Sequence, residues 1–268
     1  MKLGFFVNAY RLFSIDYALD SVVKHGYQGV ELWAKGNHIT PFDNEEIWLG
    51  IKNKILNLSL EIYGISAHLD FVAPDKNKRE LEIKKFLGVI KMAKVMGVNE
   101  VHTASGGLYK DISFDLQEKY FLEAMNILGK EAHNKGIIIA LEPEPEKWLS
   151  KPHQVVDIIE NRLSHPVFKV LFDTGHAFGV GTTPEDYLKA VKKHLHLVHL
   201  DDVRKADFPH QHLIPGEGDI DYISLFNTLK EIGYNSWISM ELNRHNEKPD
   251  AAAEKAKRFI DGYRKYWG

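Results

Sequence analysis

The segment Ile137–Glu146 reads IIIALEPEPE, a short apolar run that ends in a carboxylate. Three isoleucines followed by alanine and leucine predict a buried β-strand over Ile137–Glu142, because β-branched residues favour strands and no polar residue interrupts the run. The prolines at positions 143 and 145 cannot continue a helix or a central strand, so we expect Glu142 to stand at the end of the strand. The same arrangement, an apolar run that stops at a polar side chain, recurs along the chain.

Seven further apolar runs of this kind alternate with amphipathic segments of helical period. The predicted strands cover Lys2–Asn8, Gly29–Trp33, Glu61–His68, Glu100–Thr103, Ile137–Glu142, Lys169–Asp173, Leu195–Leu200 and Trp237–Glu241. The predicted helices cover Ile15–His25, Glu45–Leu56, Arg79–Met96, Phe114–Lys135, Pro152–Asn161, Pro184–Lys193, Tyr222–Ile232 and Ala251–Tyr266. The strand ends recur roughly every 33 residues, which is the spacing of a strand–helix unit in a barrel of about 250 residues.

Eight strand–helix units in 268 residues predict an α/β protein with a (β/α)8 TIM barrel. A doubly wound sheet is less consistent with the pattern, since eight regular units without a glycine-rich nucleotide loop are unusual for it. No linker, low-complexity tract or charge block divides the sequence, so we expect residues 1–268 to form a single catalytic domain. In such a barrel, functional side chains lie at the carboxyl ends of the strands.

The composition limits the chemistry that these side chains can perform. The chain contains 14 histidines and no cysteine, so any metal ion must be held by imidazoles and carboxylates. With 34 Lys and Arg against 37 Asp and Glu, the net charge of −3 gives no general attraction to nucleic acid or to an anionic membrane. No apolar stretch approaches the ~18 residues of a membrane span, and the first apolar run is too short for a signal peptide. We therefore expect a cytoplasmic enzyme.

Side chains of metal-ligand type lie at or near the carboxyl ends of the predicted strands, on the predicted active face. They are His68, His102, Glu142, Asp173 with His176, His199 and Glu241. Taken singly, each histidine could be a hydrogen-bonded boundary residue, and each carboxylate could be a helix N-cap. Together they would place several carboxylates in the mouth of one barrel, where they would repel one another without a cation. The sequence therefore predicts a metal site.

The neighbouring polar residues are expected to differ in role. A period of two places His194 and His196 on one strand face and His199 on the other, so only His199 is a candidate ligand. Glu144 and Glu146 follow Glu142 in a proline-rich loop, and we expect both to be solvated. The loop over residues 210–220 carries His210, His212 and Glu217 and reads as part of the site. Trp33, Phe71, Tyr109 and Trp148 follow strand ends and would either stack on a sugar ring or pack within their loops.

The order of these motifs resembles the xylose-isomerase-like TIM-barrel superfamily over nearly the whole chain. The motifs are Gly29–Trp33 (GVELW), His68, His102, Glu142, Asp173–His176 (DTGH), Val198–Asp202 (VHLDD), Pro215–Asp221 (PGEGDID) and Ser239–Glu241 (SME). The superfamily includes ketose 3-epimerases, hydroxypyruvate isomerase, inosose dehydratase and, on the same frame, endonuclease IV. The resemblance implies an enzyme with a small carbohydrate substrate, and it is compatible with a homo-oligomer.

Resemblance to the sugar epimerases implies one divalent ion, Mn2+, Mg2+, Co2+ or Zn2+, held by Glu142, Asp173, His199 and Glu241. Glu142 and Glu241 would also be the catalytic pair, one removing the proton next to a carbonyl and the other returning a proton to a metal-stabilised enediolate. Return to the same carbon from the opposite face gives an epimer, and return to the neighbouring carbon gives an isomer. The implied substrate-binding residues are His68, His102, His176, Lys205, His212 and Glu217.

Two departures from the ketose 3-epimerases weaken assignment of a particular ketohexose. Those enzymes carry a glutamate where this chain has Trp148, and an arginine where it has Lys205. An inosose dehydratase-type lyase is therefore one alternative activity. The other is an abasic-site DNA endonuclease with a multinuclear zinc site, because the chain resembles endonuclease IV at eight of its nine zinc ligands and has His210 at the ninth. The net charge of −3 and the sequence after Glu142 argue against the nuclease.

Overall fold

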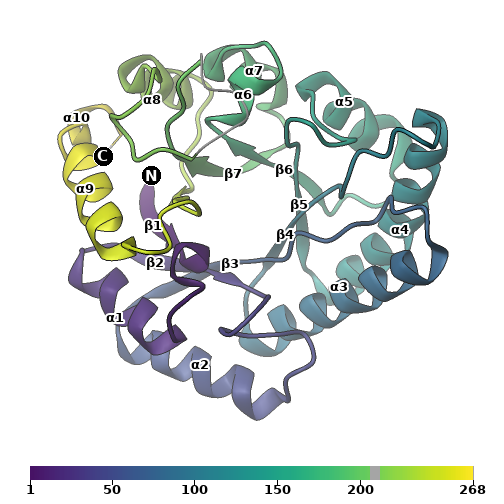
Figure 1. Ribbon diagram of the computed structural model, residues 1–268, viewed down its shortest axis with the longest axis horizontal. Helices are drawn as coiled ribbons and strands as arrows, with labels where there is room; N and C mark the ends of the chain where they lie inside the picture. The colour runs from purple at the N-terminus through teal and green to yellow at the C-terminus, as the bar shows by residue number, and fades with distance from the viewer. Residues whose placement is uncertain (206–211, 268) are drawn as a thin grey trace.

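A computed structural model describes residues 1–205 and 212–267. Eight parallel strands form a closed barrel in the order β1 to β8, with β1 paired to β8, as the sequence predicts. The strands are β1 (Lys2–Phe6), β2 (Gly29–Trp33), β3 (Glu61–Ser66), β4 (Glu100–Ala104), β5 (Ile138–Glu142), β6 (Phe168–Asp173), β7 (Leu195–Leu200) and β8 (Trp237–Met240). Figure 1 shows the view along the barrel, with the helices arranged as a ring around the strands.

The ring consists of helices that alternate with the strands along the chain. They are α1 (Ile15–Lys24), α2 (Glu45–Asn57), α3 (Lys76–Met96), α4 (Phe114–Lys135), α5 (Pro152–Asp157), α7 (Pro184–Val191), α8 (Tyr222–Glu231), α9 (Pro249–Asp261) and α10 (Arg264–Trp267). Short η1 (Val7–Tyr10), η2 (Ile158–Arg162) and α6 (His176–Gly179) complete the described elements. None of the helices in the described ranges is both long and apolar enough to cross a bilayer.

The boundaries of α4 show how local sequence sets the elements. The Ser113 hydroxyl accepts a hydrogen bond from the backbone amide of Leu116, which satisfies one of the free amides of the first turn. At the other end, Gly136 adopts φ 67°, a left-handed conformation that glycine reaches without steric cost. The predicted range Phe114–Lys135 is therefore confirmed at both ends.

Three strand ends differ from the prediction in ways that affect the site. β1 stops at Phe6 because η1 follows directly, so Asn8 lies in a helical turn instead of a strand. β3 stops at Ser66, and His68 therefore lies in the loop two residues beyond the strand. β4 continues to Ala104, which leaves His102 inside the strand and below its end. A register shift in the pairing of β6 with β7 also interrupts the regular alternation of side chains before Leu197.

The main apolar core lies between the barrel and the helices, where side chains such as Phe5, Phe86, Phe121 and Phe226 are fully buried. A much smaller apolar cluster contains Tyr63, Ala140, Leu171 and Leu197, with Trp237 packed against it. Buried polar side chains from the strands lie beside that cluster and above it. The apolar layers that usually fill such a barrel are thus partly replaced by polar groups.

Candidate metal centre and active site

Four buried ligand-type side chains from successive strands meet at the carboxyl-terminal mouth of the barrel. Glu142 ends β5, Asp173 ends β6, His199 lies near the end of β7, and Glu241 directly follows β8. Each can offer one ligand atom such that all four atoms lie within 4.8 Å of one another. None of the four residues is more than 2% exposed. Parallel strands of a barrel bring their carboxyl ends to one mouth, and this geometry gathers residues that are a hundred positions apart in the chain.

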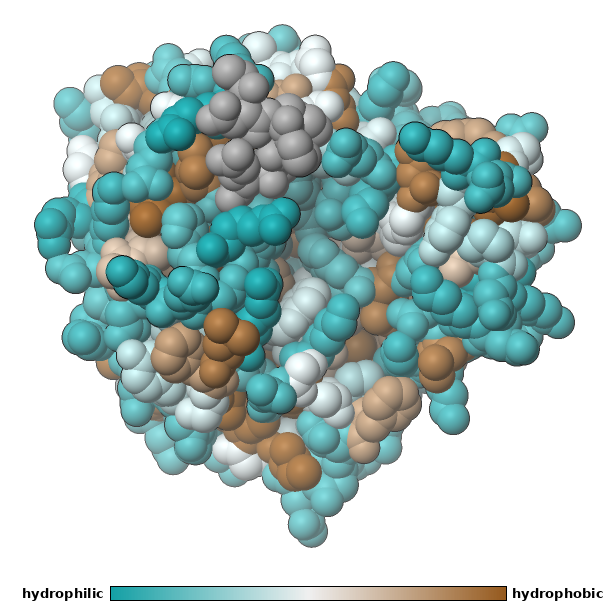
Figure 2. Space-filling model, viewed as in Figure 1, coloured by the Kyte–Doolittle hydropathy of each residue, from teal (hydrophilic) through white to brown (hydrophobic). Residues whose placement is uncertain are grey.

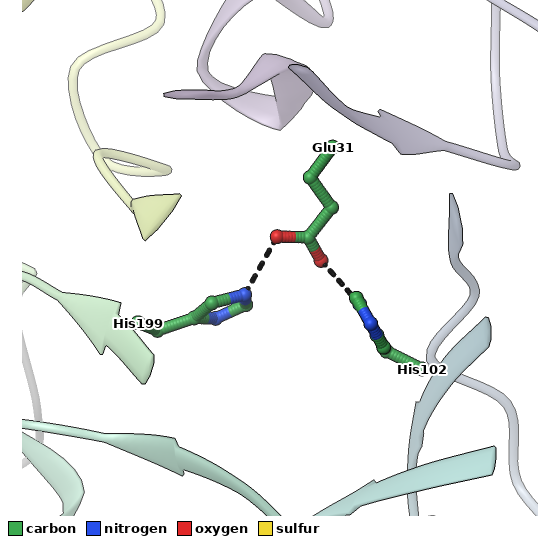
Figure 3. A group of neighbouring side chains, drawn as sticks. All are labelled: Glu31, His102 and His199. Atoms are coloured by element: carbon green, nitrogen blue, oxygen red, sulfur yellow. Dashed lines mark hydrogen bonds and ion pairs between the residues drawn. The ribbon is translucent and has the colours of Figure 1, made fainter. Parts of the chain in front are cut away.

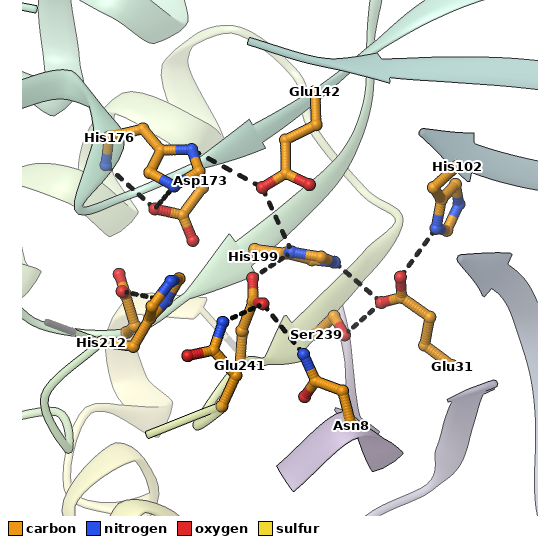
Figure 4. Close-up of polar contacts among 12 residues, drawn as sticks. Asn8, Glu31, His102, Glu142, Asp173, His176, His199, His212, Ser239 and Glu241 are labelled. Carbon is orange, nitrogen blue, oxygen red and sulfur yellow. Dashed lines mark hydrogen bonds and ion pairs between the residues drawn. The ribbon is translucent and has the colours of Figure 1, made fainter. Parts of the chain in front are cut away.

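The contacts within this group fix the orientation of its two glutamates (Figure 4). Nδ1 of His199 lies 2.7 Å from Oε2 of Glu241 and 3.8 Å from Oε1 of Glu142. The side-chain amides of Asn8 and Asn243 each donate to Oε1 of Glu241 at 3.1 Å. Glu241 is therefore held by three neighbours, and its carboxylate faces the same point as that of Glu142.

The charges of the group are strongly coupled. Burial alone would raise the pKa of Glu241, but the imidazoles of His199 and His212 outweigh it and hold that pKa well below its usual range. Burial would likewise lower the pKa of His199, yet the carboxylates of Glu31 and Glu241 raise it well above its ordinary value. The pKa of Glu142 is lowered, against the effect of burial, mainly by His68. Both glutamates are thus carboxylates at neutral pH.

This donor set suits a divalent cation. Three carboxylates and one imidazole converge within 4.8 Å, and all four side chains are almost completely buried. Oxygen and imidazole donors are the ligands that Mg2+, Mn2+, Co2+ and Zn2+ accept. Three carboxylates against one imidazole leave an excess of buried negative charge, which a cation would neutralise.

A cavity of about 420 Å3 gives access to this group. Its lining includes Asn8, Arg11, Trp33, Lys35, His68 and Glu241. A second cavity of about 550 Å3 shares Lys35, Gly36 and His68 with the first and extends over the loops that follow β2 to β5. Figure 2 shows hydrophilic side chains gathered around a hollow near the centre of this face. The two cavities combine apolar walls with charged and polar groups, and each is large enough for a small hydroxylated molecule.

We use the name metal-type group for Glu142, Asp173, His199 and Glu241. Three of the predicted substrate-binding histidines surround it. Nε2 of His68 lies 3.0 Å from Oε2 of Glu142, and this carboxylate raises the pKa of His68 to about 9 although burial opposes the shift. Nδ1 of His176 lies 3.6 Å from Oε1 of Glu142. The ring of His212 contacts that of His176, with centroids 5.9 Å apart, and its Nδ1 lies 2.9 Å from Oδ2 of Asp201.

Three other predicted substrate-binding residues lie elsewhere. His102 is fully buried inside the barrel because β4 continues beyond it. Glu217 points toward α9, where its carboxylate pairs with the Lys255 ammonium at 2.5 Å. Lys205 is exposed, and its ammonium lies over the ring of Phe178 at 4.6 Å. The structure therefore does not bring His102 or Glu217 to the cavity. His210, the ninth zinc-ligand position of the nuclease alternative, lies outside the described residues.

The structure changes one loop prediction and decides between the two alternatives for some of the aromatic residues. Glu144 is only partly solvated, since its side chain is 20% exposed, its carboxylate lies 3.6 Å from Nδ1 of His68, and burial raises its pKa. Among the aromatic candidates, Phe71 and Trp148 are buried and pack within the fold. Trp33 lines the cavity and meets His68 edge to face, at 5.4 Å between centroids.

Sequence reasoning missed the polar side chains below the metal-type group. Glu31 in β2 contacts both His199 and His102, and Glu100 in β4 contacts both His102 and His196. The expectation that His196 and His199 lie on opposite faces of their strand is wrong, because a register shift in β7 separates them and Nε2 of His196 lies 2.6 Å from Glu100. A carboxylate between valine and leucine in Gly29–Trp33 was the available signal, since a charge within an apolar strand requires a partner.

A closed (β/α)8 barrel with buried metal-ligand side chains at its strand ends is the class that the fold and site define. Residues 19–263 match the family model of the xylose isomerase-like TIM barrel. The chain therefore belongs to the xylose isomerase-like TIM barrel family.

Several characterised relatives have similar sequences. The inosose isomerase of Bacillus licheniformis is 29% identical over 178 residues, and the match covers 63% of each chain. The inosose dehydratase of Erwinia tasmaniensis is 29% identical over 194 residues, covering 63% of this chain and 64% of that one. The inosose isomerase of Bacillus subtilis is 23% identical over 261 residues and is matched over 92% of its length. The chain thus covers just under two thirds of the length of the first two relatives.

Two solved structures have the same fold. A D-tagatose 3-epimerase-like protein superposes with a TM-score of 0.86 at 21% identity, covering 99% of this chain and 97% of that one. The IolI protein, crystallised with a zinc atom, superposes with a TM-score of 0.84 at 23% identity over the full length of both chains. At these identities the likeness establishes the fold alone.

Proposed function

We propose that the protein is a divalent-metal-dependent isomerase or epimerase of a sugar or sugar derivative. The observation that carries the proposal is the meeting of Glu142 and Glu241, two buried carboxylates that belong to one potential metal-ligand group. The relatives named inosose isomerase and inosose dehydratase support the same class of substrate. The ion would be held by Glu142, Asp173, His199 and Glu241, and Mn2+, Mg2+, Co2+ and Zn2+ all suit these donors.

The chemistry begins with a proton on the carbon next to a carbonyl group. When bound, a divalent ion would supply Lewis-acid polarisation of the carbonyl oxygen. One of the two glutamates removes the proton, and the electron pair of the broken C–H bond moves toward the carbonyl to form an enediolate. The other glutamate, which is also a carboxylate in the metal-free protein, first takes up a proton from water and then donates it to carbon. Return of the proton to the same carbon from the opposite face gives an epimer. Return to the former carbonyl carbon gives an isomer, provided that the hydroxyl proton of the neighbouring carbon passes to the former carbonyl oxygen.

The surrounding side chains prepare the two glutamates for these roles. Asn8 and Asn243 hold Oε1 of Glu241, so its carboxylate keeps one orientation through the reaction. His68 carries a proton at neutral pH and lies 3.0 Å from Glu142, where it stabilises the ionised form. His68 and Trp33 line the cavity, and we assign substrate hydroxyls to His68. His176 lies beside Glu142 and contacts His212, so we assign these two histidines to the metal-proximal end of the substrate.

Deuterium exchange tests the proposal directly. The metal-loaded protein is incubated in D2O with a panel of ketoses and inososes, and NMR follows deuterium entry at the carbon next to the carbonyl. We expect exchange with at least one member of the panel and none after chelation by EDTA. Absence of exchange with every member, from protein that retains metal, would contradict the enediolate mechanism. Loss of water from an inosose in the same experiment would identify a dehydratase.

The metal content separates this proposal from the nuclease alternative. We expect one bound ion per chain by inductively coupled plasma mass spectrometry, held by the group that contains Glu142. Three ions per chain, together with EDTA-sensitive cleavage of an abasic-site oligonucleotide, would instead support a nuclease.

A further inference from the structure

Polar side chains form a continuous chain of contacts inside the barrel, below the metal-type group. We use the name barrel column for Glu31, His102, Glu100 and His196. Oε2 of Glu31 lies 2.8 Å from Nε2 of His199, and Oε1 of Glu31 lies 2.8 Å from Nδ1 of His102. Oε1 of Glu100 lies 2.7 Å from Nε2 of His102, and its Oε2 lies 2.6 Å from Nε2 of His196. The column thus joins a candidate metal ligand to the lower part of the barrel.

The column is deeply buried. Glu31 and His102 are fully inaccessible, and His196 at the far end has a side chain that is 27% exposed. Figure 3 shows Glu31 between the two imidazoles, with one carboxylate oxygen directed at each. Burying charged groups carries a desolvation penalty, and replacing such groups by apolar residues of similar volume is often neutral or stabilising. Fold stability alone therefore does not account for the column.

Two glycines make room for these groups. A Cβ on Gly64 would lie 2.2 Å from Cε1 of His102, and a Cβ on Gly4 would lie 2.1 Å from Cε1 of Tyr63. Tyr63 donates to the Ser239 hydroxyl at 2.6 Å, and Ser239 in turn donates to Oε2 of Glu31 at 2.7 Å. Both glycines are thus required by side chains that surround Glu31.

The contacts of Glu31 determine which nitrogen of His199 faces the metal-type group. A carboxylate only accepts hydrogen bonds, so Nε2 of His199 must be the donor to Glu31. The other ring nitrogen, Nδ1, then points to Oε2 of Glu241 at 2.7 Å. Metal-binding imidazoles commonly donate their second N–H to a carboxylate, which fixes both the tautomer and the orientation of the ring.

We propose that Glu31 is a positioning residue for the metal centre. It holds the His199 ring with Nδ1 toward Glu142, Asp173 and Glu241, and the rest of the barrel column together with Ser239 holds Glu31 in place. This inference rests on the metal-dependent function proposed above. Metal affinity can be measured without any substrate, so a failure of the sugar chemistry and a failure of this inference give different results.

The test compares Glu31→Gln with the wild-type protein. Glutamine keeps the size of the side chain but loses its charge. We expect the Kd for Zn2+ and for Mn2+, measured by isothermal titration calorimetry on metal-free protein, to rise by about 10- to 100-fold, as for other partners of metal-bound histidines. The matched control is Glu61→Gln, since Glu61 is exposed, lies at the start of β3 and contacts Lys2. Its Kd should stay within twofold of the wild-type value.

A spectroscopic readout separates positioning from general damage. In the zinc-loaded wild-type protein labelled with 15N-histidine, we expect the Nε2 proton of His199 to exchange slowly with water. In Glu31→Gln the same proton should exchange faster, while the backbone amide spectrum away from the site is retained. A slow Nε2 proton and an unchanged Kd in the folded variant would overturn the inference.

Two milder variants carry the test if Glu31→Gln does not fold. Ser239→Ala removes one donor to Glu31, and we expect the Kd to rise by roughly 2- to 10-fold, the equivalent of one ordinary hydrogen bond. Gly64→Ala displaces His102 without changing any hydrogen-bonding group, and it should also weaken metal binding. Values within twofold of wild type for both folded variants would overturn the inference, and so would a wild-type protein that binds none of these metals.

Discussion

The barrel column and the metal centre are both buried and share a boundary at His199, but their charges are arranged differently. In the column, carboxylates alternate with imidazoles, so that Glu31 and Glu100 each lie between two rings. In the metal centre, three carboxylates surround one imidazole. Each carboxylate of the column therefore contacts two imidazoles, whereas the three carboxylates of the centre require a cation or protons. This difference indicates that the two buried polar regions have different roles. The barrel column is part of the scaffold, whereas the metal centre is the region proposed to bind the ion and react.

The largest expected effect is the loss of turnover when a glutamate of the metal centre is changed. Glu241→Gln keeps the size of the side chain and removes the proton-transfer group, so kcat should fall by roughly 10²- to 10⁴-fold. The measurement is the rate of deuterium entry into the substrate that the panel identifies. Glu61→Gln is the control and should retain full activity. Retention of more than a tenth of wild-type turnover in Glu241→Gln would remove this residue from the catalytic pair.

A substitution in the column should instead reduce stability. His102→Gln leaves Glu31 and Glu100 without the ring that lies between them, so we expect the free energy of unfolding to fall by about 3–5 kcal/mol. Urea denaturation of metal-free protein measures the change. His133→Gln in α4 is a suitable control, because this position lies at the end of a surface helix. A loss below 1 kcal/mol for His102→Gln would show that the column does not depend on the alternation of charge.

Metal addition should act on the centre and leave the column unchanged. Binding to the folded state alone stabilises a protein by about 2.7 kcal/mol when the free ion is at 100 times its Kd. We expect this gain for wild type in zinc or manganese and its absence in Asp173→Asn, with unfolding followed by circular dichroism. An equal gain in Asp173→Asn would place the ion elsewhere.

The pH dependence of stability should report the column in metal-free protein. Contacts with Glu31 and Glu100 raise the pKa of His102 to about 9, against the effect of burial, from an ordinary value of 6.5. A raised imidazole pKa stabilises the fold fully below pH 6.5, and this contribution is lost as the pH rises toward 9. We expect the free energy of unfolding to decline by roughly 3 kcal/mol over this window because of His102, with a further decline from His68. If the free energy of unfolding of His102→Gln declined with pH as steeply as that of the wild-type protein, the attribution of this decline to His102 would be contradicted.

The smallest effect is expected outside both regions. Glu217→Gln removes an ion pair with Lys255 at a partly exposed position, so stability should change by less than about 1 kcal/mol. The KM for the substrate should not change, because the carboxylate points toward α9. A severalfold rise in KM would return Glu217 to the substrate-binding set and would overturn its placement here.

The candidate ligands at the strand ends were predictable from the sequence, because each of them ends a short apolar run. Glu142 follows an apolar run and precedes a proline, and Asp173 follows another run and precedes a glycine turn. The (β/α)8 order then requires these ends to meet, whatever their separation in the chain. By contrast, His68, His102 and His196 depend on where a strand stops or shifts its register, and local patterns locate such points only to within a few residues.

The sequence by itself determined the barrel, the eight strand–helix units and the carboxylates at the strand ends, because period and composition are local properties of the chain. Only the tertiary structure decided which polar groups pair inside the barrel. Glu31 and His199 are 168 positions apart, and their 2.8 Å contact exists because β2 and β7 direct these side chains into one interior. No local pattern encodes a contact across a closed barrel, since it depends on the register of every strand between the two residues.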